Sequence, residues 1–220
     1  MRKKTIILDF DGTLADTQSL IVCTMQQTIA ELQLEPRTDE ECATMIGLPL
    51  KQCFTHLIPM TDEMGDHCAE TYRRIFFENV HSMDVPTFPH VLETIRQLAN
   101  DGYTLTIASS RSRISLMHFV ESMHLQEDIA YIVASDDITH SKPHPESVLV
   151  TLEHLNVKAE DALVVGDTTY DIEMGKAAGT FAIGVTWGYH QPEELLAAGA
   201  DCLVETYADL PAAIDSLLES

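Results

Sequence analysis

The chain has 220 residues, of which 45% are hydrophobic and 22% are charged, so it can form the core of one domain with an elaboration or of two small domains. It carries 13 Lys and Arg residues against 35 Asp and Glu residues, a formal net charge of −22. So acidic a surface repels nucleic acids and anionic membranes, and no apolar run is long enough for a membrane span. We therefore expect neither nucleic acid nor membrane as a partner.

The cysteines and the N-terminus predict a cytoplasmic protein. The five cysteines are odd in number and form no CxxC pair, which is typical of reduced thiols. The apolar run that follows "MRKK" stops at Asp9 and is too short for the hydrophobic part of a signal peptide.

The first predicted element is a buried strand over residues 5–10, and its end is unusual. Asp9 and Asp11 stand two residues apart, and Gly12 follows them. An isolated Asp-x-Asp-Gly is most often a turn or a helix cap. Two carboxylates at the tip of a buried strand nevertheless call for a charged partner, because they repel each other.

Residues 16–83 contain only helical patterns. The first predicted helix begins after an N-cap at Asp16 or Thr17. The patterns cover residues 16–34, 38–46, 48–58 and 61–80. The sequence thus predicts a helical domain inserted directly after the first strand.

Beyond the insertion, predicted strands alternate with predicted helices. This alternation predicts a doubly wound, Rossmann-like parallel sheet of the α/β class. We expect a core domain formed by residues 1–15 and 84–220, and a helical cap domain formed by residues 16–83. The further strands are expected at 103–108, 130–134, 161–165, 181–185 and 202–204, and the further helices at 89–100, 112–124, 145–155, 169–178, 192–198 and 207–218.

Chemically active side chains gather where these strands end. In doubly wound sheets, ligands bind beyond the carboxyl ends of the strands, where the strand order reverses. A cluster of carboxylates there would need a cation, and oxygen ligands alone favour a hard ion such as Mg²⁺. Together with a hydroxyl group and a lysine, such a cluster suits phosphoryl transfer with an aspartate as nucleophile. The residues concerned are Asp9, Asp11, Ser109, Ser110, Arg111, Lys142, Asp167 and Asp171.

Four segments give these residues a family resemblance. "DFDGTLADT", "IASSR", "SKPHP" and "GDTTYD", in this order, resemble the four motifs of the haloacid dehalogenase superfamily. The helical insertion resembles the cap that this family carries between its first two motifs. "FPHV" and "GVTWGY" resemble the phosphoglycolate phosphatase-like branch, to which the beta-phosphoglucomutase-like enzymes are close.

The resemblance implies a role for each catalytic residue. Asp9 is implied to be the nucleophile that forms an aspartyl-phosphate. Asp11 is implied to protonate the leaving group and then to activate water. Ser109 would hydrogen-bond the phosphoryl group, and Lys142 would neutralise charge and hold Asp9.

The same resemblance implies the binding residues. Mg²⁺ would be held by Asp9, Asp167 and the backbone carbonyl of Asp11, with Asp171 as a partner of the metal-bound waters. Phosphate would be bound by Gly12 and Lys142. The remaining phosphate-binding candidates are Ser109, Ser110 and Arg111.

The expected function is that of a Mg²⁺-dependent phosphatase for a small phosphorylated metabolite, present as a monomer or weak homodimer. The alternatives are a hexose-phosphate mutase, a pyrophosphatase and a protein that keeps the fold without catalysis. No histidine lies between Asp16 and Gln27, where sugar mutases of the superfamily carry one, and this favours the phosphatase. Two departures blur the choice of substrate: His90 replaces the usual glycine, and Ser110 and Arg111 replace Asn and Lys.

Overall fold

The computed structural model describes residues 4–80, 82–83 and 85–218. The chain forms two compact units, one comprising the chain up to Leu14 and from Thr87 onward, the other spanning Ala15–Pro86. The predicted return to the core at residue 84 and the predicted outer limits at residues 1 and 220 lie outside the described residues. None of the described helices combines the length and apolar character needed to cross a lipid bilayer.

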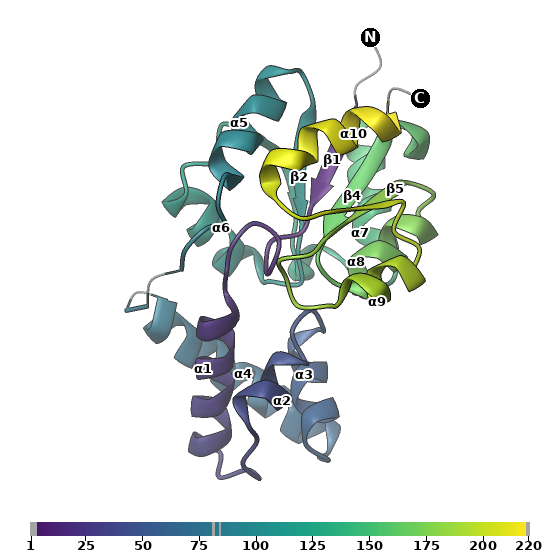
Figure 1. The fold of residues 1–220 in the computed structure, drawn as a ribbon. Helices are drawn as coiled ribbons and strands as arrows, with labels where there is room; N and C mark the ends of the chain where they lie inside the picture. Colours follow the sequence, from purple (N-terminus) through teal and green to yellow (C-terminus); the bar gives the residue numbers. More distant parts are fainter. Residues whose placement is uncertain (1–3, 81, 84, 219–220) are drawn as a thin grey trace. The chain divides into compact units, whose positions relative to one another are not determined.

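The first unit is built on a parallel sheet of six strands in the order β3-β2-β1-β4-β5-β6 (Figure 1). The chain runs from β1 outward to β3, and then crosses to β4 on the other side of β1. This reversal of direction confirms the predicted doubly wound fold. The strands are β1 (Thr5–Leu8), β2 (Thr104–Ala108), β3 (Ile129–Val133), β4 (Ala162–Gly166), β5 (Phe181–Val185) and β6 (Cys202–Val204).

The first strand is two residues shorter than predicted. Leu8 is its last residue, although the Asp9 amide still donates to the Val165 carbonyl at 2.9 Å. Beyond this point the chain coils back, and the Leu14 amide donates to the Phe10 carbonyl at 2.9 Å. The apolar pattern continues through Phe10 because that side chain is fully buried, not because the strand continues.

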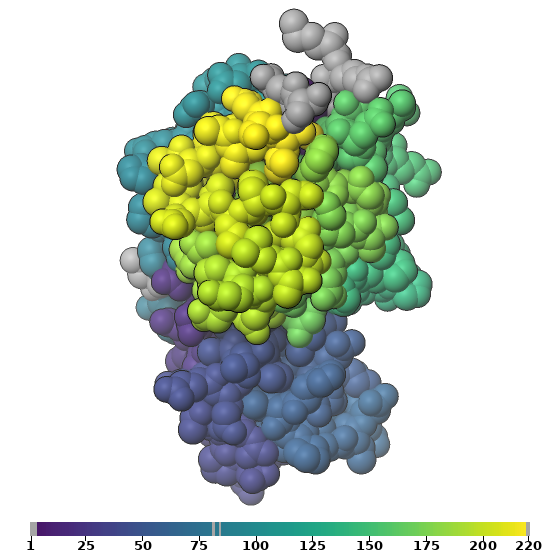
Figure 2. Space-filling model, turned by 45° about the vertical axis from the view of Figure 1, so that its right-hand side comes forward, coloured from purple at the N-terminus to yellow at the C-terminus, as the bar shows by residue number. Residues whose placement is uncertain are grey.

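Helices connect the strands of this unit. Val148 of α7 and Met174 of α8 pack against Ile7 and Val164 of the sheet in one apolar cluster. Elsewhere in this unit, α5 packs against α10, and the Thr94 hydroxyl of α5 donates to the Tyr207 carbonyl at 3.2 Å. The residues that follow β4, drawn green to yellow, form one continuous surface in Figure 2. The helices are α5 (Val91–Asn100), α6 (Arg113–Ser122), α7 (Glu146–Leu155), α8 (Thr169–Ala177), α9 (Pro192–Ala197) and α10 (Leu210–Leu218).

All regular secondary-structure elements described between Ala15 and Pro86 are helices. Helices α1 (Gln18–Glu31) and α4 (Asp62–Val80) pack side by side, and α3 (Leu50–Leu57) packs on α4. A short helix, α2 (Asp39–Ala43), lies between α1 and α3 in the chain. Buried aromatic rings fill the interior, and Phe54 meets Tyr72 edge to face with centroids 6.1 Å apart.

Candidate active site

Three neighbouring strands bring the predicted catalytic residues to one edge of the sheet. Leu8 of β1 lies opposite Ile107 of β2 and Val165 of β4. Asp9, Ser109 and Asp167 follow these strands, so all three lie near the same carboxyl ends. This edge is the point where the strand order reverses, which is where doubly wound sheets bind ligands.

Lys142 joins two of the carboxylates. Its ammonium group donates to Asp9 Oδ1 and, at 2.6 Å, to Asp171 Oδ1. Lys142 comes from the loop between β3 and α7, and only 7% of its surface is exposed. The loop lysine singled out in the sequence is therefore a buried ion-pair partner of Asp9.

Asp171 is fixed by the start of its own helix. Its Oδ2 accepts hydrogen bonds from the Thr168 amide at 3.1 Å and from Thr168 Oγ1 at 2.6 Å. Thr168 and Asp171 form a capping box at the N-terminus of α8. The carboxylate thus caps the helix with one oxygen and pairs with Lys142 through the other.

Asp167 is fully buried and held by both of its oxygens. Oδ1 accepts a hydrogen bond from Thr13 Oγ1 at 3.0 Å, and Oδ2 accepts one from the Tyr189 amide at 2.9 Å. The loop of Gly12 passes so close that a Cβ there would lie 2.3 Å from Asp167 Oδ2. Gly12 also has a φ of +78°, so both its conformation and its space require glycine.

The clustered carboxylates change one another's affinity for protons. Burial raises the pKa of Asp9, and the charges of Asp171 and Asp11 raise it further, against the lowering effect of Lys142; the pKa reaches about 7. Burial also raises the pKa of Asp167, as do Asp171 and Asp9. Burial opposes the charge of Lys142, but Asp171 and Asp9 outweigh it and raise the pKa of that ammonium. Negative charge in this site therefore exceeds what one lysine neutralises.

This excess of negative charge fits a divalent metal ion. One oxygen from each of Asp9, Asp167 and Asp171 lies within 4.8 Å of the others, and all three residues are buried. A site made of carboxylate oxygens alone favours a hard cation. Asp9 and Asp167 belong to the implied metal set, and the described cluster adds Asp171 to them.

The Asp11 side chain is turned toward a cation of the protein. Its Oδ1 accepts hydrogen bonds from Arg111 Nε at 2.8 Å and Nη2 at 2.5 Å. The guanidinium carbon of Arg111 lies 4.9 Å from the centre of the Phe119 ring, and Arg111 Nη1 donates to Ser115 Oγ at 3.0 Å. Arg111, a predicted phosphate ligand, is thus bound here to the predicted general acid.

The two serines lie beside this pair at the end of β2. Ser109 is 3% exposed, and its amide donates to the Val133 carbonyl at 3.0 Å. Its hydroxyl oxygen accepts from the Arg111 amide at 3.2 Å. Ser110 is half-buried in the same turn.

Sequence analysis did not identify three residues that hold the carboxylates of the site in place. Thr13 and the Tyr189 amide hold Asp167, and Thr168 holds Asp171. Thr168 could have been found, because a threonine three residues before an aspartate at a helix start is a capping-box signal. The Tyr189 contact could not, since a backbone amide leaves no mark in the sequence.

Comparison with known proteins places this chain among hydrolases. Residues 6–185 match the model of a family described as haloacid dehalogenase-like hydrolase. The chain is 34% identical over 220 residues to "Probable phosphatase IndB" of Dickeya dadantii, covering 99% of this chain and 96% of that protein. It is 33% identical over 210 residues to "Pyrophosphatase PpaX" of Anoxybacillus flavithermus, covering 96% of each.

A solved structure shares the fold. The crystal structure of a "predicted phosphatase" from Clostridium acetobutylicum superposes with a TM-score of 0.89. The match covers 99% of this chain and 100% of that one, at 24% identity. Because the two sequences are only 24% identical, this comparison shows a shared fold and does not indicate a shared substrate.

Proposed function

Because the chain belongs to the haloacid dehalogenase-like hydrolase family, we propose that it is a Mg²⁺-dependent phosphatase for a small phosphorylated metabolite. The family match confirms the resemblance inferred from the four motifs, and the phosphatases among the relatives agree with the predicted hydrolytic enzyme. The observation that most supports the mechanism is the buried Asp9 carboxylate, which shares the Lys142 ammonium with Asp171. We propose a cytoplasmic protein that acts as a monomer or weak homodimer.

Asp9 is the proposed nucleophile. One of its carboxylate oxygens attacks phosphorus, the bond from phosphorus to the leaving oxygen breaks, and an aspartyl-phosphate forms. Lys142 orients Asp9 through its ion pair and keeps it from turning away. Since Lys142 is itself anchored by Asp171, the nucleophile is held in place before the substrate arrives.

Asp11 is the proposed general acid and base. In the first step it gives a proton to the leaving oxygen. In the second it takes a proton from the water that attacks phosphorus, which releases inorganic phosphate and restores the Asp9 carboxylate. Asp11 must leave Arg111 to do so, and the freed guanidinium is then available to the substrate's anionic group.

The remaining predicted residues bind the phosphoryl group and the metal. Ser109 supplies a hydroxyl donor, while Gly12 and Ser110 supply backbone amides. Mg²⁺ would be held by Asp9, Asp167 and the Asp11 carbonyl, where it would offset the repulsion between the carboxylates and the phosphoryl oxygens. Asp171 has the proposed role of holding Lys142 and the waters of the metal.

Pyrophosphate is a second candidate substrate. The specific reason is the 33% identity, over nearly the whole chain, to a protein named as a pyrophosphatase. The same nucleophile, Asp9, and the same general acid, Asp11, would serve, with phosphate as the leaving group in place of an alcohol. A sugar mutase, in contrast, must keep water from the aspartyl-phosphate, and residues 16–27 lack the histidine that sugar mutases carry there.

A substrate panel tests this proposal. The purified protein with Mg²⁺ is incubated with phosphoglycolate, pyrophosphate, sugar phosphates and nucleoside monophosphates, and released phosphate is measured. We expect phosphate release that ceases when Asp9 is replaced by Asn. With beta-glucose 1-phosphate and a trace of the bisphosphate, glucose 6-phosphate forming faster than free phosphate would make the protein a mutase.

A further inference from the structure

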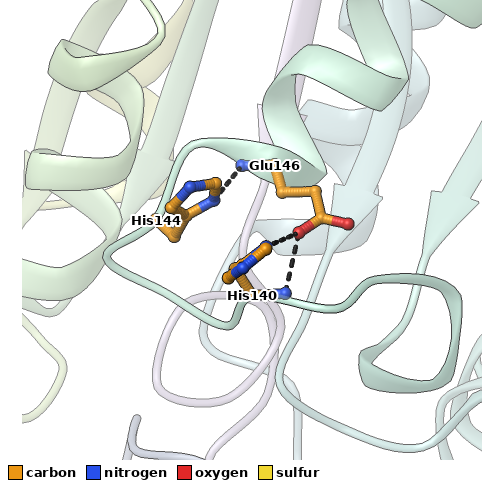
Figure 3. Close-up of side chains that lie close together, drawn as sticks. All are labelled: His140, His144 and Glu146. Atoms are coloured by element: carbon orange, nitrogen blue, oxygen red, sulfur yellow. Dashed lines mark hydrogen bonds and ion pairs between the residues drawn. The ribbon is translucent and has the colours of Figure 1, made fainter.

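A second group of metal-binding side chains flanks Lys142. His140 and His144 stand two residues before and two after it in the loop between β3 and α7, and Glu146 is the first residue of α7. We propose that His140, His144 and Glu146 bind a divalent transition-metal ion such as Zn²⁺ at a site separate from the carboxylate cluster of Asp9. Figure 3 shows the two imidazole rings and the carboxylate gathered on one side of the loop.

The three side chains are already within reach of one ion. One ligand atom from each lies within 4.8 Å of the others. The two rings have centroids 4.5 Å apart and are tilted by 32°. His140 Nδ1 is 2.7 Å from Glu146 Oε2, and His144 Nδ1 accepts a hydrogen bond from the Glu146 amide at 3.3 Å.

The kinds of ligand select the kind of ion. Two imidazoles and one carboxylate form a three-ligand set known from zinc proteins, with a fourth position left for water. Imidazole nitrogen suits zinc, copper, nickel and iron, whereas Mg²⁺ prefers oxygen ligands. The site therefore differs in selectivity from the buried cluster of Asp9, Asp167 and Asp171, which offers oxygen alone.

The Glu146 carboxylate is held in place by the backbone of its own loop. Its Oε1 accepts from the Thr139 amide at 2.9 Å, and its Oε2 accepts from the His140 amide at 2.7 Å. These hydrogen bonds and the His140 ring lower the pKa of the Glu146 carboxyl. A carboxylate anchored on two backbone amides is a prepared ligand, because the loop has already ordered it.

The side chains must move to admit the ion, because the three ligand atoms lie up to 4.8 Å apart and one pair lies closer than a bound ion allows. Zinc bonds of about 2.0–2.1 Å in a tetrahedral site separate two ligand atoms by about 3.3 Å, so the 2.7 Å between His140 and Glu146 must widen by about 0.6 Å. The His140 side chain is 62% exposed and can make this movement while Glu146 stays in place. The His140 nitrogen that binds the metal must carry no proton, so in the bound form any ring proton lies on the other nitrogen.

Such an ion would stiffen the loop that carries the catalytic lysine. Lys142 lies midway between the two histidines, and its ammonium is paired with Asp9 and Asp171. Tying His140 and His144 to Glu146 would close a short ring of backbone around Lys142. The ion would thus act as a structural brace and would not touch the substrate.

Zinc binding to the full-length protein in excess Mg²⁺ tests the site. Histidine ring signals are followed by NMR, and affinity is measured by competition with a chromogenic chelator. Of the 10 histidines, we expect only the His140 and His144 rings to shift as the first equivalent of Zn²⁺ is added. Replacing His140 or His144 by Ala, or Glu146 by Gln, should weaken binding at least about tenfold, since losing even an outer partner of a ligand costs 10–100-fold.

Matched variants come from α7 itself. His154→Ala and Glu153→Gln alter an exposed histidine and glutamate of that helix and should bind Zn²⁺ like the unchanged protein. Glu146→Gln keeps an oxygen acceptor for only one of the Thr139 and His140 amides, whereas the two histidine variants leave both of these hydrogen bonds in place and so separate lost ligation from a disordered loop. Equal Zn²⁺ affinity in the His140 and His144 variants, or ring shifts at other histidines instead, would overturn the proposal.

Discussion

At the scale of single residues, Lys142 organises the charges of the catalytic site. It contacts Asp9 on β1's end and Asp171 on α8, while Asp167 is held separately by Thr13 and Tyr189. Burial raises the pKa values of Asp9 and Asp167, and repulsion among three carboxylates that a single ammonium cannot neutralise raises them further. We propose that this excess of negative charge is balanced by a metal ion before an anionic substrate binds.

The first prediction concerns Asp11. Replacing Asp11 by Asn should lower kcat by about 10²–10⁴-fold, because general acid–base help of this size is lost in both steps. Asp101→Asn, a change at an exposed aspartate at the end of α5, should leave kcat unchanged. Steady-state kinetics with the best substrate of the panel measures both. A kcat for Asp11→Asn within threefold of the unchanged enzyme would remove Asp11 from the proposed role.

The second prediction concerns metal and pH. Without metal, the raised pKa of Asp9 means that the folded state holds a proton that the unfolded state loses, so stability falls as pH rises from the ordinary value of 3.8 to about 7. Mg²⁺ competes with this proton and relieves the repulsion, so it should raise the unfolding temperature more above pH 7 than below it.

Differential scanning calorimetry with chelator or with excess Mg²⁺ measures this difference in unfolding temperature. Asp167→Asn should reduce the gain from Mg²⁺, whereas Asp101→Asn should keep it. A gain that is equal at both pH values and unaffected by Asp167→Asn would contradict a metal site at these carboxylates.

At the scale of elements, α2 and α8 both begin with a capping box, but the two boxes differ in burial. Thr168 and Asp171 form a capping box on α8, and Thr38 and Glu41 form one on α2. The box on α2 is exposed, while that on α8 is buried and its carboxylate also binds Lys142. The capping box of α8 thus also holds Lys142, a residue of the proposed catalytic site.

The third prediction uses this pair. Thr168→Val and Thr38→Val should each destabilise the protein by about 1 kcal/mol, since each removes an N-cap hydrogen bond. Thr168→Val should in addition lower kcat, because Asp171 loses the hydroxyl that orients it toward Lys142. Denaturant unfolding and kinetics on both variants separate the effects. Equal kcat in the two variants would show that the α8 cap has no part in positioning Lys142.

Sequence patterns predicted most of the helices and strands, but only some of the contacts in the candidate site. Alternating strands and helices identified the fold because buried parallel strands read as apolar runs. The burial of Lys142 and the pairing of Asp11 with Arg111 could not be predicted, since both depend on contacts between residues more than 90 positions apart. The backbone conformation of His90 could have been predicted. This residue stands where the family has glycine, and its φ of 67° is the left-handed conformation that glycine favours.

At the scale of the whole chain, the helical insertion begins and ends at neighbouring points. The Phe88 amide donates to the Leu14 carbonyl at 3.3 Å, and the Asp16 amide donates to the Pro86 carbonyl at 2.9 Å. The two segments that connect the units, around Ala15 and around Pro86, are therefore joined to each other by backbone hydrogen bonds. Such a connection lets the insertion be removed without stretching the core.

The fourth prediction follows from this connection. Replacing residues 15–86 by a short glycine-rich linker should leave a core that still gains stability from Mg²⁺. We propose that the insertion sets substrate selectivity, so kcat/KM values across the phosphate panel should become more alike in the shortened protein. An unchanged ranking and spread of kcat/KM values would assign selectivity to the core instead.

The central claim is that Asp9 carries the phosphoryl group, and chemical trapping measures this directly. The enzyme is quenched during turnover and treated with borohydride, which reduces an aspartyl-phosphate to homoserine, and the peptides are analysed by mass spectrometry. We predict homoserine at position 9 only when substrate and Mg²⁺ are both present, and none in Asp9→Asn. Homoserine at another aspartate, or undiminished turnover by Asp9→Asn, would contradict the proposed mechanism.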